Sequence, residues 1–467
     1  MRMLRNKSLT LWDSLADSGD LSGLFVADAE VRVGFSDLVT GSAMDGRGDE
    51  LRGKSVLILV KGQLAAAMVM LELDGIARRI VLCPPDLPLE HLPSVIAAGD
   101  VDTIVSDRES YGPDISRIRY FMGCSRTVVP HRYDRTSQCE TEWVLLTSGT
   151  SGPPKLVVHT LSSLAGAIKP GSTSAEQVVW STFYDIRRYG GLQIFLRAIL
   201  AKTSLVLSSP AEPTAGFLAR AGYYGITHIS GTPSHWRHAL MSSSAQLIHP
   251  EYVRLSGEIA DQGILNQLRS AYPHAKIVHA FASTEAGVAF EVTDGDAGFP
   301  ASALENTPGI EMKIEDHSLR IRSNRSASRY LGTESRKPLK DSEGFVDTCD
   351  MIDLRDGRCY FLGRRDGVIN VGGLKVHPEE VEAVINRHPR VEVSRVRTKK
   401  NPITGGLVVA DVVLKDASSS AGYDPRALQH DILMFCREAL SPYKVPGAVY
   451  FVPALAIAET GKLVRLA

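Results

Sequence analysis

Residues 147–155 read TSGTSGPPK, a short stretch with the composition of a loop that holds phosphate. Gly149 and Gly152 allow backbone angles in which successive N–H groups point into one concavity, and the neighbouring hydroxyl groups add donors. Lys155 supplies a compact positive charge at the end of the stretch. The spacing differs from the GxxxxGK[ST] pattern of a Walker loop, which argues against an ordinary kinase or ATPase. Taken alone, such a stretch is more often a surface turn than a phosphate-binding loop, so the choice between the two depends on other motifs in the chain.

The chain is long enough for more than one domain. At 467 residues it exceeds the length at which a single hydrophobic core keeps growing. Its 52 Lys and Arg residues nearly balance its 53 Asp and Glu residues, so no global basic field recruits nucleic acid or an anionic membrane. We therefore expect no nucleic-acid partner, and any anionic ligand must be held locally.

The cysteines and the amino-terminal residues indicate the cellular compartment in which the protein resides. The six cysteines are scattered without a CxxC pair, which argues against a zinc knuckle and against a disulfide framework. The first residues, MRMLRNKSLTLWDSL, carry positive charge without a following apolar segment, and no apolar run reaches the roughly 18 residues of a membrane span. We expect a cytoplasmic protein without a membrane span.

Apolar runs alternate with helical patterns in two regions of the chain. The expected strands are 55–60, 80–83, 103–106, 178–180, 204–207 and 227–229, and the expected helices are 63–73, 88–98, 191–201 and 217–222. Uninterrupted apolar strands alternating with helices indicate parallel sheets covered by helices on both faces. The strand ends of two such sheets would meet at a cleft, which is where α/β folds bind ligands.

The pattern changes near Pro308. From there to Leu362 short alternating strands are expected, as at 319–323 and 359–362, with Asp356-Gly357 as a hairpin turn. After Gly363 a compact segment has its own helices and strands. The helices are predicted at about 378–387 and 425–439, and the strands at about 391–397 and 407–414. The sequence thus predicts an α/β protein with a large domain over 1–362, which contains helix-covered sheets and a β-rich subdomain, and a small, mobile α+β domain over 363–467.

Four further motifs follow TSGTSGPPK at long range. They are ASTEAG at 282–287, DTCD ending at Asp350, GRRDGVINVGGLKVHPEE at 363–380 and TGK at 460–462. Together and in this order, the five elements resemble those of the adenylate-forming superfamily of acyl-CoA synthetases, peptide-synthetase adenylation domains and luciferases. The resemblance runs from about Val56 to the end of the chain. It reverses the interpretation of the first stretch as a mere surface turn.

The resemblance implies an ATP site built from several of these motifs. Thr284 would contact the α-phosphate, Glu285 would bind Mg²⁺, and Asp350 and Arg364 would hold the ribose. A carboxylate beside a triphosphate is otherwise repelled, so a hard oxygen ligand for Mg²⁺ is its useful role there. The remaining residues implied for ATP are Thr147, Ser148, Gly149, Thr150, Ser151, Gly152, Lys155, Gly257, Glu258, Ala280, Phe281, Ala282 and Ser283.

Two of these positions depart from the superfamily pattern. Phe281-Ala282 stands where Tyr-Gly is usual, so Phe281 keeps a face for adenine to stack on but lacks the hydroxyl group. Cys349 stands where a Gly usually precedes Asp350. On local signals alone, Ser283 or Thr284 is also compatible with the N-cap of a helix.

The carboxyl-terminal motifs imply two reaction steps. Lys462 matches the catalytic lysine, whose ammonium group would lower the repulsion between an anionic carboxylate and the α-phosphate. In the superfamily the small domain then rotates, which withdraws this lysine and presents the face that includes Gly373 and Lys375 to a thiol. Asp366 falls at the hinge position, and a short polar linker between two domains is a plausible pivot.

The segment STFYDIRRYGG at 181–191 falls where the superfamily has its acyl pocket and a frequent gating His, but it contains no His. Phe183, Tyr184, Tyr189 and Gly190 could line a pocket for a flat or aliphatic acid. Asp185 could instead bind the ammonium group of an amino acid, and Arg187 or Arg188 a second carboxylate. Exposed charges flanking a core strand are the commoner explanation for these three residues. A separate group, His228, His235 and His279, lacks metal-ligand spacing and is interpreted as packing residues or as residues that support the side chains of the site.

Two classes of function follow. The favoured one is an enzyme that converts a carboxylic acid and ATP to acyl-AMP and pyrophosphate, with Mg²⁺, and passes the acyl group to coenzyme A. Within this class a carrier protein or an amine is the alternative acceptor, the latter giving an amide ligase; a luciferase-type oxidation is remote. The other class is a non-catalytic nucleotide-binding regulator on the same fold, but the presence of Lys462 and Glu285 argues against it. We expect a monomer or a homodimer.

Overall fold

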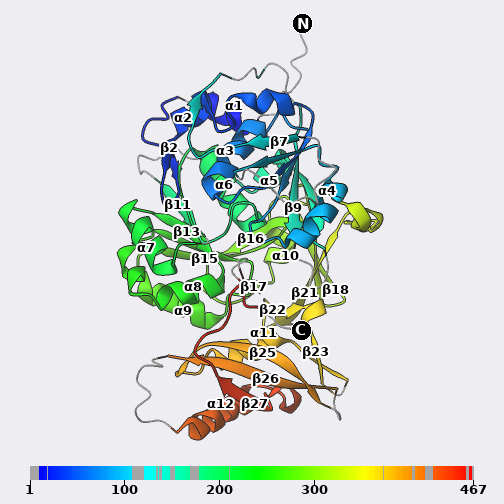
Figure 1. The fold of residues 1–467 in the computed structure, drawn as a ribbon. Coiled ribbons are helices and arrows are strands. Elements are labelled where there is room, and N and C mark those ends of the chain that lie inside the picture. Colours follow the sequence, from blue (N-terminus) through cyan, green and yellow to red (C-terminus); the bar gives the residue numbers. More distant parts are fainter. Residues whose placement is uncertain are drawn as a thin grey trace.

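A computed structural model shows how these segments fold. It describes residues 10–17, 19–107, 120–132, 135, 139–147, 153–168, 178–209, 211–371, 373–401, 405–415, 424–458 and 462–464. A large domain holds both extended sheets, and a small domain packs below it (Figure 1). None of the described helices is both long and apolar enough to cross a membrane.

The first sheet has eight strands in the order β16-β15-β14-β13-β11-β12-β1-β2. Its strands are β1 Phe25–Ala27, β2 Arg32–Gly34, β11 Val179–Thr182, β12 Ser204–Leu207, β13 His228–Gly231, β14 Tyr252–Ser256, β15 Lys276–Ser283 and β16 Gly287–Val292. The six inner strands run parallel, and β2 and β16 pair antiparallel at the two edges. The expected parallel sheet is therefore present, with two strands added from the amino-terminal region.

The second sheet has seven strands in the order β20-β10-β9-β5-β4-β6-β7. They are β4 Ser55–Ile58, β5 Arg79–Leu82, β6 Thr103–Ser106, β7 Tyr120–Gly123, β9 Glu142–Thr147, β10 Lys155–Thr160 and β20 Arg329–Leu331. Strands β9, β5, β4, β6 and β7 are parallel, whereas β10 and β20 pair antiparallel. A two-stranded ladder joins β3 Gly41–Ser42 to β8 Val129–Pro130.

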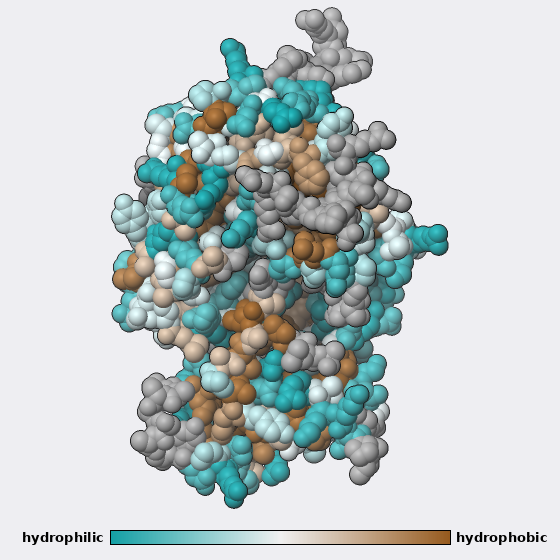
Figure 2. All heavy atoms as spheres, in the orientation of Figure 1, coloured by the Kyte–Doolittle hydropathy of each residue, from teal (hydrophilic) through white to brown (hydrophobic). Residues whose placement is uncertain are grey.

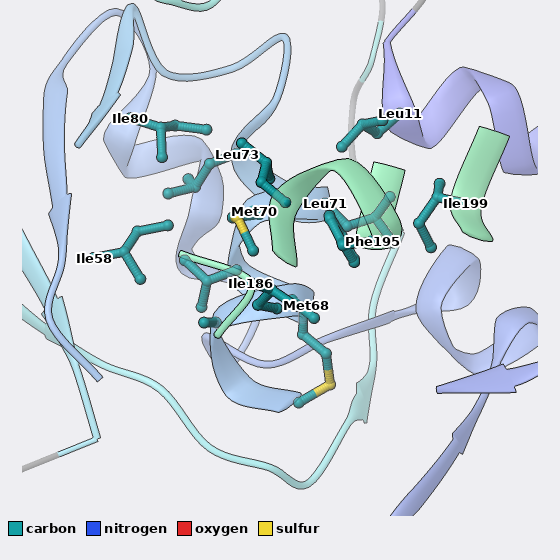
Figure 3. Packing of buried hydrophobic residues seen from close by; sticks show 14 of the residues in the cluster. Leu11, Ile58, Met68, Met70, Leu71, Leu73, Ile80, Ile186, Phe195 and Ile199 are labelled. Atoms are coloured by element: carbon teal, nitrogen blue, oxygen red, sulfur yellow. The ribbon is translucent and has the colours of Figure 1, made fainter. Parts of the chain in front are cut away.

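Helices cover both faces of both sheets. The helices of the large domain are α1 Leu11–Ala16, α2 Phe35–Thr40, α3 Gln63–Leu73, α4 Leu92–Gly99, α5 Leu161–Ala165, α6 Tyr189–Ala201, α7 Thr214–Tyr223, α8 Pro233–Leu240 and α9 Gln262–Ala271, with short 3₁₀ turns at Arg47–Leu51, Leu89–His91 and Ser243–Leu247. The largest core unites α1, α3 and α6 with strands of both sheets, as Ile58, Ile80, Met70 and Phe195 illustrate (Figure 3). Every residue of α3 is buried, as expected of a helix between two sheets. Separate cores lie under α7 to α9 and under α4.

The β-rich subdomain is a five-stranded antiparallel sheet in the order β17-β22-β21-β19-β18. Its elements are β17 Phe299–Pro300, α10 Ala303–Asn306, β18 Ile310–Glu315, β19 Ser318–Ser323, β21 Val346–Arg355 and β22 Arg358–Arg364, with a 3₁₀ turn η4 at Gly332–Arg336. The expected turn between β21 and β22 is confirmed, since Asp356 and Gly357 both have positive φ, at 48° and 75°.

The small domain has its own core, which begins at Ile369. Its elements are the 3₁₀ turn η5 Arg365–Gly367, β23 Ile369–Val371, β24 Leu374–Val376, α11 Pro378–Ile385, β25 Val391–Asn401, β26 Gly405–Leu414, α12 Pro425–Ala439, the 3₁₀ turn η7 Pro442–Lys444 and β27 Ala448–Phe451. Strands β25, β26 and β27 form a three-stranded sheet, with β23 and β24 paired as a hairpin. The predicted class, an α/β large domain with a β-rich subdomain and a small α+β domain, is confirmed.

One local expectation is wrong. ASTEAG does not begin a helix, because β15 and β16 form a hairpin around it. The Ser283 side chain accepts a hydrogen bond from the Ala286 N–H at 2.9 Å, which is the bond an N-cap residue makes, but here it closes a turn. Gly287 has a φ of 82°, and a Cβ there would lie 2.4 Å from the carbonyl oxygen of Arg325. A helix is therefore excluded by the close approach of these two backbones.

Candidate active site

The carboxyl end of β14 meets the last described segment of the chain. Gly257 follows β14 with a φ of 85°, and the Lys462 Cε lies 3.8 Å from the position that a Cβ on Gly257 would take. The next residue, Glu258, accepts the Leu463 N–H at 3.1 Å through Oε1 and the Ser234 N–H at 2.9 Å through Oε2. The structure thus brings three of the predicted site residues together, although Lys462 is more than 200 residues from the other two.

The tail that carries Lys462 is tied to the small domain. The Ala458 N–H donates to the Lys462 carbonyl oxygen at 2.8 Å, and the Val464 N–H donates to the Ala456 carbonyl oxygen at 3.0 Å. The Arg395 Nη1 donates to the Val464 carbonyl oxygen at 3.1 Å. Because Arg395 belongs to β25, the position of Lys462 is coupled to the orientation of the whole small domain.

Asp350 and Arg364 face each other across β21 and β22, where they are direct partners in the ladder. Burial raises the pKa of Asp350 to about 6, and the positive charges of Arg364 and Lys462 oppose this rise. Lys462 is therefore near Asp350 as well as near Gly257. Cys349, before Asp350, has a φ of 59°, the left-handed region in which Gly is favoured.

Thr284 and Glu285 lie in the turn between β15 and β16. The His159 Nε2 donates to the Thr284 carbonyl oxygen at 2.7 Å, and His159 is fully buried on β10. Burial lowers the pKa of His159 to about 4, so the ring is neutral at neutral pH and holds this carbonyl as a neutral donor. His159 was not predicted as a site residue, because a single His within an apolar strand resembles an ordinary packing residue.

Lys155 and Glu285 both lie close to Tyr330. The Lys155 Nζ is 5.7 Å from the centre of the Tyr330 ring and 3.8 Å from Oε2 of Glu334. Burial, and then the negative charge of the Glu285 carboxylate next to it, raise the pKa of the Tyr330 hydroxyl group. Tyr330 and Glu334 were not predicted as site residues.

The Glu285 carboxylate fits a divalent cation only in part. Within the described residues, no three His, Cys, Asp or Glu side chains are grouped as a metal centre. Mg²⁺ is commonly held by one or two carboxylates together with substrate phosphates and water, so Glu285 suits an ion that arrives with a nucleotide.

The phosphate-loop candidate is bounded by two strands. Thr147 ends β9 and Lys155 begins β10, and they are ladder partners, so the stretch between them connects an antiparallel pair. Ser148, Gly149, Thr150, Ser151 and Gly152 lie outside the described residues. Their assignment to phosphate stays a prediction.

The four residues predicted for the acyl pocket do not all face one space. The Tyr184 Oη donates to the Ser256 carbonyl oxygen at 2.6 Å, and Gly190 packs against the Tyr184 ring. Phe183 instead stacks on His235, with ring centres 5.3 Å apart, within the core under α7 to α9. Tyr189 is buried at the start of α6, 5.8 Å from the His159 ring.

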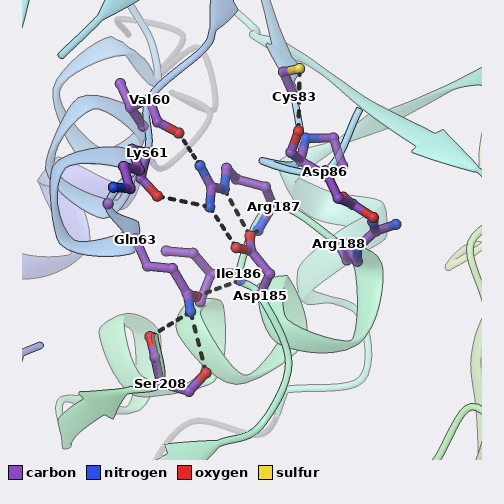
Figure 4. A network of polar contacts seen from close by, with 12 residues as sticks. Val60, Lys61, Gln63, Cys83, Asp86, Asp185, Ile186, Arg187, Arg188 and Ser208 are labelled. Carbon is purple, nitrogen blue, oxygen red and sulfur yellow. Dashed lines mark hydrogen bonds and ion pairs between the residues drawn. The ribbon is translucent and has the colours of Figure 1, made fainter. Parts of the chain in front are cut away.

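Asp185 and Arg187 are not exposed charges. Arg187 is fully buried, its Nε donates to Asp185 Oδ1 at 2.8 Å and its Nη2 to Oδ2 at 2.5 Å. The guanidinium also donates to the carbonyl oxygens of Val60 and Lys61, beyond the end of β4 (Figure 4). The two side chains therefore satisfy each other and join the ends of the two sheets, which argues against the amino-acid and second-carboxylate roles for them. Arg188, likewise, pairs with Asp86.

Other predicted residues have packing partners. His235 stacks on Phe183, and burial lowers the pKa of His235 to about 3. His228 stacks on Tyr252, and the His279 Nε2 donates to the Asp296 carbonyl oxygen at 3.0 Å. The predicted packing role therefore agrees with their surroundings.

Phe281, the predicted adenine contact, belongs to an aromatic cluster. Its ring is parallel to that of Phe361, with centres 5.1 Å apart and planes 8° apart, and it also stacks on Phe290. Ala280 and Ala282 lie beside it on β15. A stacking contact with adenine stays a prediction.

The hinge and transfer candidates lie on the small-domain side. Asp366 lies in η5, where the Arg364 Nε donates to its Oδ1 at 3.0 Å. Gly373 and Lys375 belong to the β23–β24 hairpin, and both are exposed. In this structure, therefore, Lys462 faces the large domain while the hairpin is open to solvent.

Comparisons with known proteins identify both domains. The family model described as AMP-binding enzyme matches residues 74–325, and the model described as AMP-binding enzyme C-terminal domain matches residues 380–462. Human mitochondrial acyl-coenzyme A synthetase ACSM2B is 27% identical over 363 residues, which cover 72% of this chain and 62% of that protein. Acetyl-coenzyme A synthetase 2 of Zygosaccharomyces bailii is 27% identical over 379 residues, covering 70% and 54%. The chain thus spans less than two thirds of the length of these relatives.

Solved structures share the fold. A benzoate CoA ligase from Burkholderia xenovorans superposes with a TM-score of 0.80 at 17% identity, covering 98% of this chain and 99% of that one. The amide bond synthetase McbA from Marinactinospora thermotolerans superposes with a TM-score of 0.74 at 18% identity, covering 97% of each chain.

Proposed function

Because the chain belongs to the AMP-binding enzyme family, whose model matches more than half of it, we propose that it activates a carboxylic acid with ATP and transfers the acyl group to coenzyme A. In the first step a carboxylate oxygen attacks the α-phosphorus of ATP, and pyrophosphate leaves. In the second step the thiol sulfur attacks the acyl carbon, AMP leaves, and the thiol proton is released. The chain would act as an AMP-forming acid–thiol ligase.

The position of Lys462 is the observation that supports this proposal most. Its side chain reaches the carboxyl end of β14 and lies near Asp350, the residue proposed to hold the ribose hydroxyl groups. An ammonium group at this point can contact both an acid and an α-phosphate, and it stabilises the charge that develops as they meet. Thr284 would contact the α-phosphate from the turn that follows the neighbouring strand, β15, with its carbonyl group held by His159.

Other groups would bind the rest of ATP. Lys155 and the stretch 148–152 would surround the β- and γ-phosphates, and Arg364 would contact the ribose beside Asp350. Glu285 would bind Mg²⁺, which neutralises phosphate charge when it is bound. We expect no reaction in EDTA, restoration by Mg²⁺ or Mn²⁺, and a raised metal requirement in Glu285→Gln with an unchanged melting temperature. Full activity in EDTA would contradict the metal role.

A panel of acids tests the reaction. Pyrophosphate release should be measured with fatty, aryl, amino and dicarboxylic acids, followed by mass spectrometry of reactions that contain coenzyme A, a holo-carrier protein or an amine. An acyl-CoA product supports the proposal. An acylated carrier or an amide would identify the alternative acceptor, and nucleotide binding without pyrophosphate release from any acid would favour a non-catalytic regulator.

We propose further that the protein is cytoplasmic and acts as a monomer or a homodimer. The scattered, unpaired cysteines support a reducing compartment. Light scattering coupled to size-exclusion chromatography would determine the oligomeric state.

A further inference from the structure

A polar layer lies between α6 and the eight-stranded sheet. Tyr189, Gln193 and Arg197 are four residues apart along α6 and therefore share one face of it. Ser230 of β13 and Arg254 of β14 are ladder partners, so their side chains project to one side of the sheet. The two faces meet, because the Arg197 guanidinium lies 5.6 Å from the centre of the Trp180 ring on the same side of the sheet.

The charge in this layer is predominantly positive. Arg254 is 4% exposed, and its Nε donates to Oε1 of Glu291 at 3.1 Å. Burial, and then the like charge of Arg254, lower the pKa of Arg197. Two arginines beside one partly exposed carboxylate leave excess positive charge in a largely buried place, and this is costly unless an anion balances it.

Several donors and acceptors in the layer are unused. An arginine has five N–H donors, and Arg254 directs donors to Glu291 and to the Tyr252 hydroxyl group. Within the described chain, Ser230 Oγ, Gln193 Oε1 and Arg197 Nε are buried without a hydrogen-bond partner. Ser230 and Gln193 are 0% and 4% exposed, so solvent does not satisfy them. Such atoms in a packed interior point to a ligand.

The layer lies beside the residues proposed for chemistry. Tyr184 and Tyr189 are close enough for the Arg254 charge to act on both hydroxyl groups, and Tyr184 also contacts the carbonyl oxygen of Ser256. Along β14, Arg254 precedes Gly257 by three residues, a rise of about 10 Å. Gly257 is where the Lys462 side chain arrives.

We propose that Arg254 is a specificity-determining residue that binds a second anionic group, such as a carboxylate, at the far end of a short acid substrate. The inference rests on the proposed function, since it assumes that the reacting carboxylate lies near Lys462. The acid would extend from Lys462 toward Arg254, with Ser230 and Gln193 offering hydrogen bonds along its side. The substrate class is thus a short dicarboxylic or comparable doubly anionic acid, and a plain aliphatic or aryl acid would leave Arg254 without a ligand.

Two matched acyl-adenylate analogues test this inference. Both are acyl sulfamoyl adenosines with chains of equal length, one ending in a carboxylate and the other in a methyl group. Isothermal titration calorimetry should show that the native protein binds the carboxylate analogue at least tenfold more tightly. Arg254→Met should weaken that analogue on the order of thirtyfold or more, the usual result of removing one partner of a buried charge pair, and change the methyl analogue less than threefold.

Two further variants separate recognition from structure. Arg254→Lys keeps the charge without the planar fork and should retain part of the preference. Glu291→Gln removes the ion partner but not the guanidinium group, so the preference for the carboxylate analogue should persist. Equal binding of the two analogues to the native protein, or equal weakening of both by Arg254→Met, would overturn the specificity role and leave the proposed reaction intact. Failure of both analogues to bind the folded protein would overturn the acyl-adenylate site and this inference with it.

Discussion

At the scale of single residues, the sequence motifs predict which side chains belong to the site, and the structure adds what holds them. Asp350 and Arg364 match superfamily positions, and the structure makes them ladder partners. The contacts of Thr284 with His159 and of Leu463 with Glu258 join residues separated by 125 and 205 positions. Such pairs follow from the three-dimensional fold, so no local pattern could have predicted them. For Asp185 and Arg187 the sequence-based expectation was wrong. Charged residues at the end of a strand were expected to be exposed, but these two form a buried ion pair.

Lys462 should matter for one half-reaction only. Lys462→Ala should lower acyl-AMP formation on the order of a hundredfold or more, because a charge stabiliser for the transition state is lost. The same variant should still convert synthetic acyl-AMP and coenzyme A to acyl-CoA. Pyrophosphate release and acyl-CoA formation measure the two steps separately. Lys399→Ala, an exposed lysine on the same small domain, serves as the control and should leave both rates unchanged. Near-normal pyrophosphate release by Lys462→Ala would remove this lysine from the chemistry.

Cys349 occupies a backbone conformation that suits Gly. With φ at 59°, a residue with a side chain is strained by about 1 kcal/mol or more, and Gly removes that strain at some cost in unfolded-state entropy. Cys349→Gly should therefore raise the free energy of unfolding by up to about 1 kcal/mol, whereas the β-branched Cys349→Val should lower it by at least that much. Urea denaturation of the three proteins measures the difference. Destabilisation by both substitutions would show that the cysteine side chain contributes more by packing than the backbone loses by strain.

At the scale of elements, strong apolar patterns were predictable and short or turn-dependent ones were not. The prediction for α3 over 63–73 agrees with its observed bounds, and so does that for α12 over 425–439. The first is a long apolar run of helix-forming residues and the second is strongly amphipathic, and both signals are strong. Strands β1 and β2 have three residues each, too few for a period to be visible. In ASTEAG, a Ser that can accept a backbone N–H is compatible with both a helix N-cap and a turn. The close approach of Gly287 to the Arg325 backbone excludes the helix, so a turn forms.

The attachment of α1 should depend on pH. The Asp74 carboxylate accepts the Leu11 N–H at 2.9 Å and the Trp143 Nε1–H at 3.2 Å. Burial raises the pKa of Asp74 to about 6, and these hydrogen bonds and the Arg135 charge oppose the rise. Because the folded-state pKa exceeds the unfolded value of about 4, the native protein binds more protons than the unfolded chain does at pH values between the two pKa values. The stability contributed by this group is complete below about pH 4 and is lost as the pH rises through about 6.

Asp74→Asn isolates this contribution. The amide keeps an acceptor for Leu11 but does not titrate, so the fall in unfolding free energy between about pH 4 and pH 7 should shrink by on the order of 2–3 kcal/mol. Chemical denaturation at several pH values measures it. Asp100→Asn removes a carboxylate whose side chain is 78% exposed and should leave the pH dependence unchanged. Identical pH profiles for Asp74→Asn and the native protein would refute the assignment.

At the scale of the whole molecule, the structure holds one orientation of the two domains. Leu463 bonds Glu258, and the Asn386 Nδ2 at the end of α11 donates to Asp261 Oδ2 at 3.4 Å. Apolar side chains gather on the visible face where the small domain meets the large one (Figure 2). This orientation brings Lys462 to the candidate site, as the proposed first half-reaction would require. The sequence motifs imply a second orientation, in which the hairpin that carries Gly373 and Lys375 would face the site.

The exchange between orientations should depend on Asp366. This residue lies in η5, between the end of β22 and the small-domain core, and its helical φ already suits proline. Asp366→Pro would fix φ near roughly −65° and remove an N–H, so the present orientation should persist while the rotation becomes difficult. The variant should therefore retain acyl-AMP formation and lose most of its transfer to coenzyme A. Asp366→Ala removes the ion pair with Arg364 without constraining φ, and it should keep both steps.

Pyrophosphate release, conversion of synthetic acyl-AMP and melting temperature should be measured for both variants. Equal loss of the two half-reactions in Asp366→Pro, at an unchanged melting temperature, would place the pivot elsewhere in the chain.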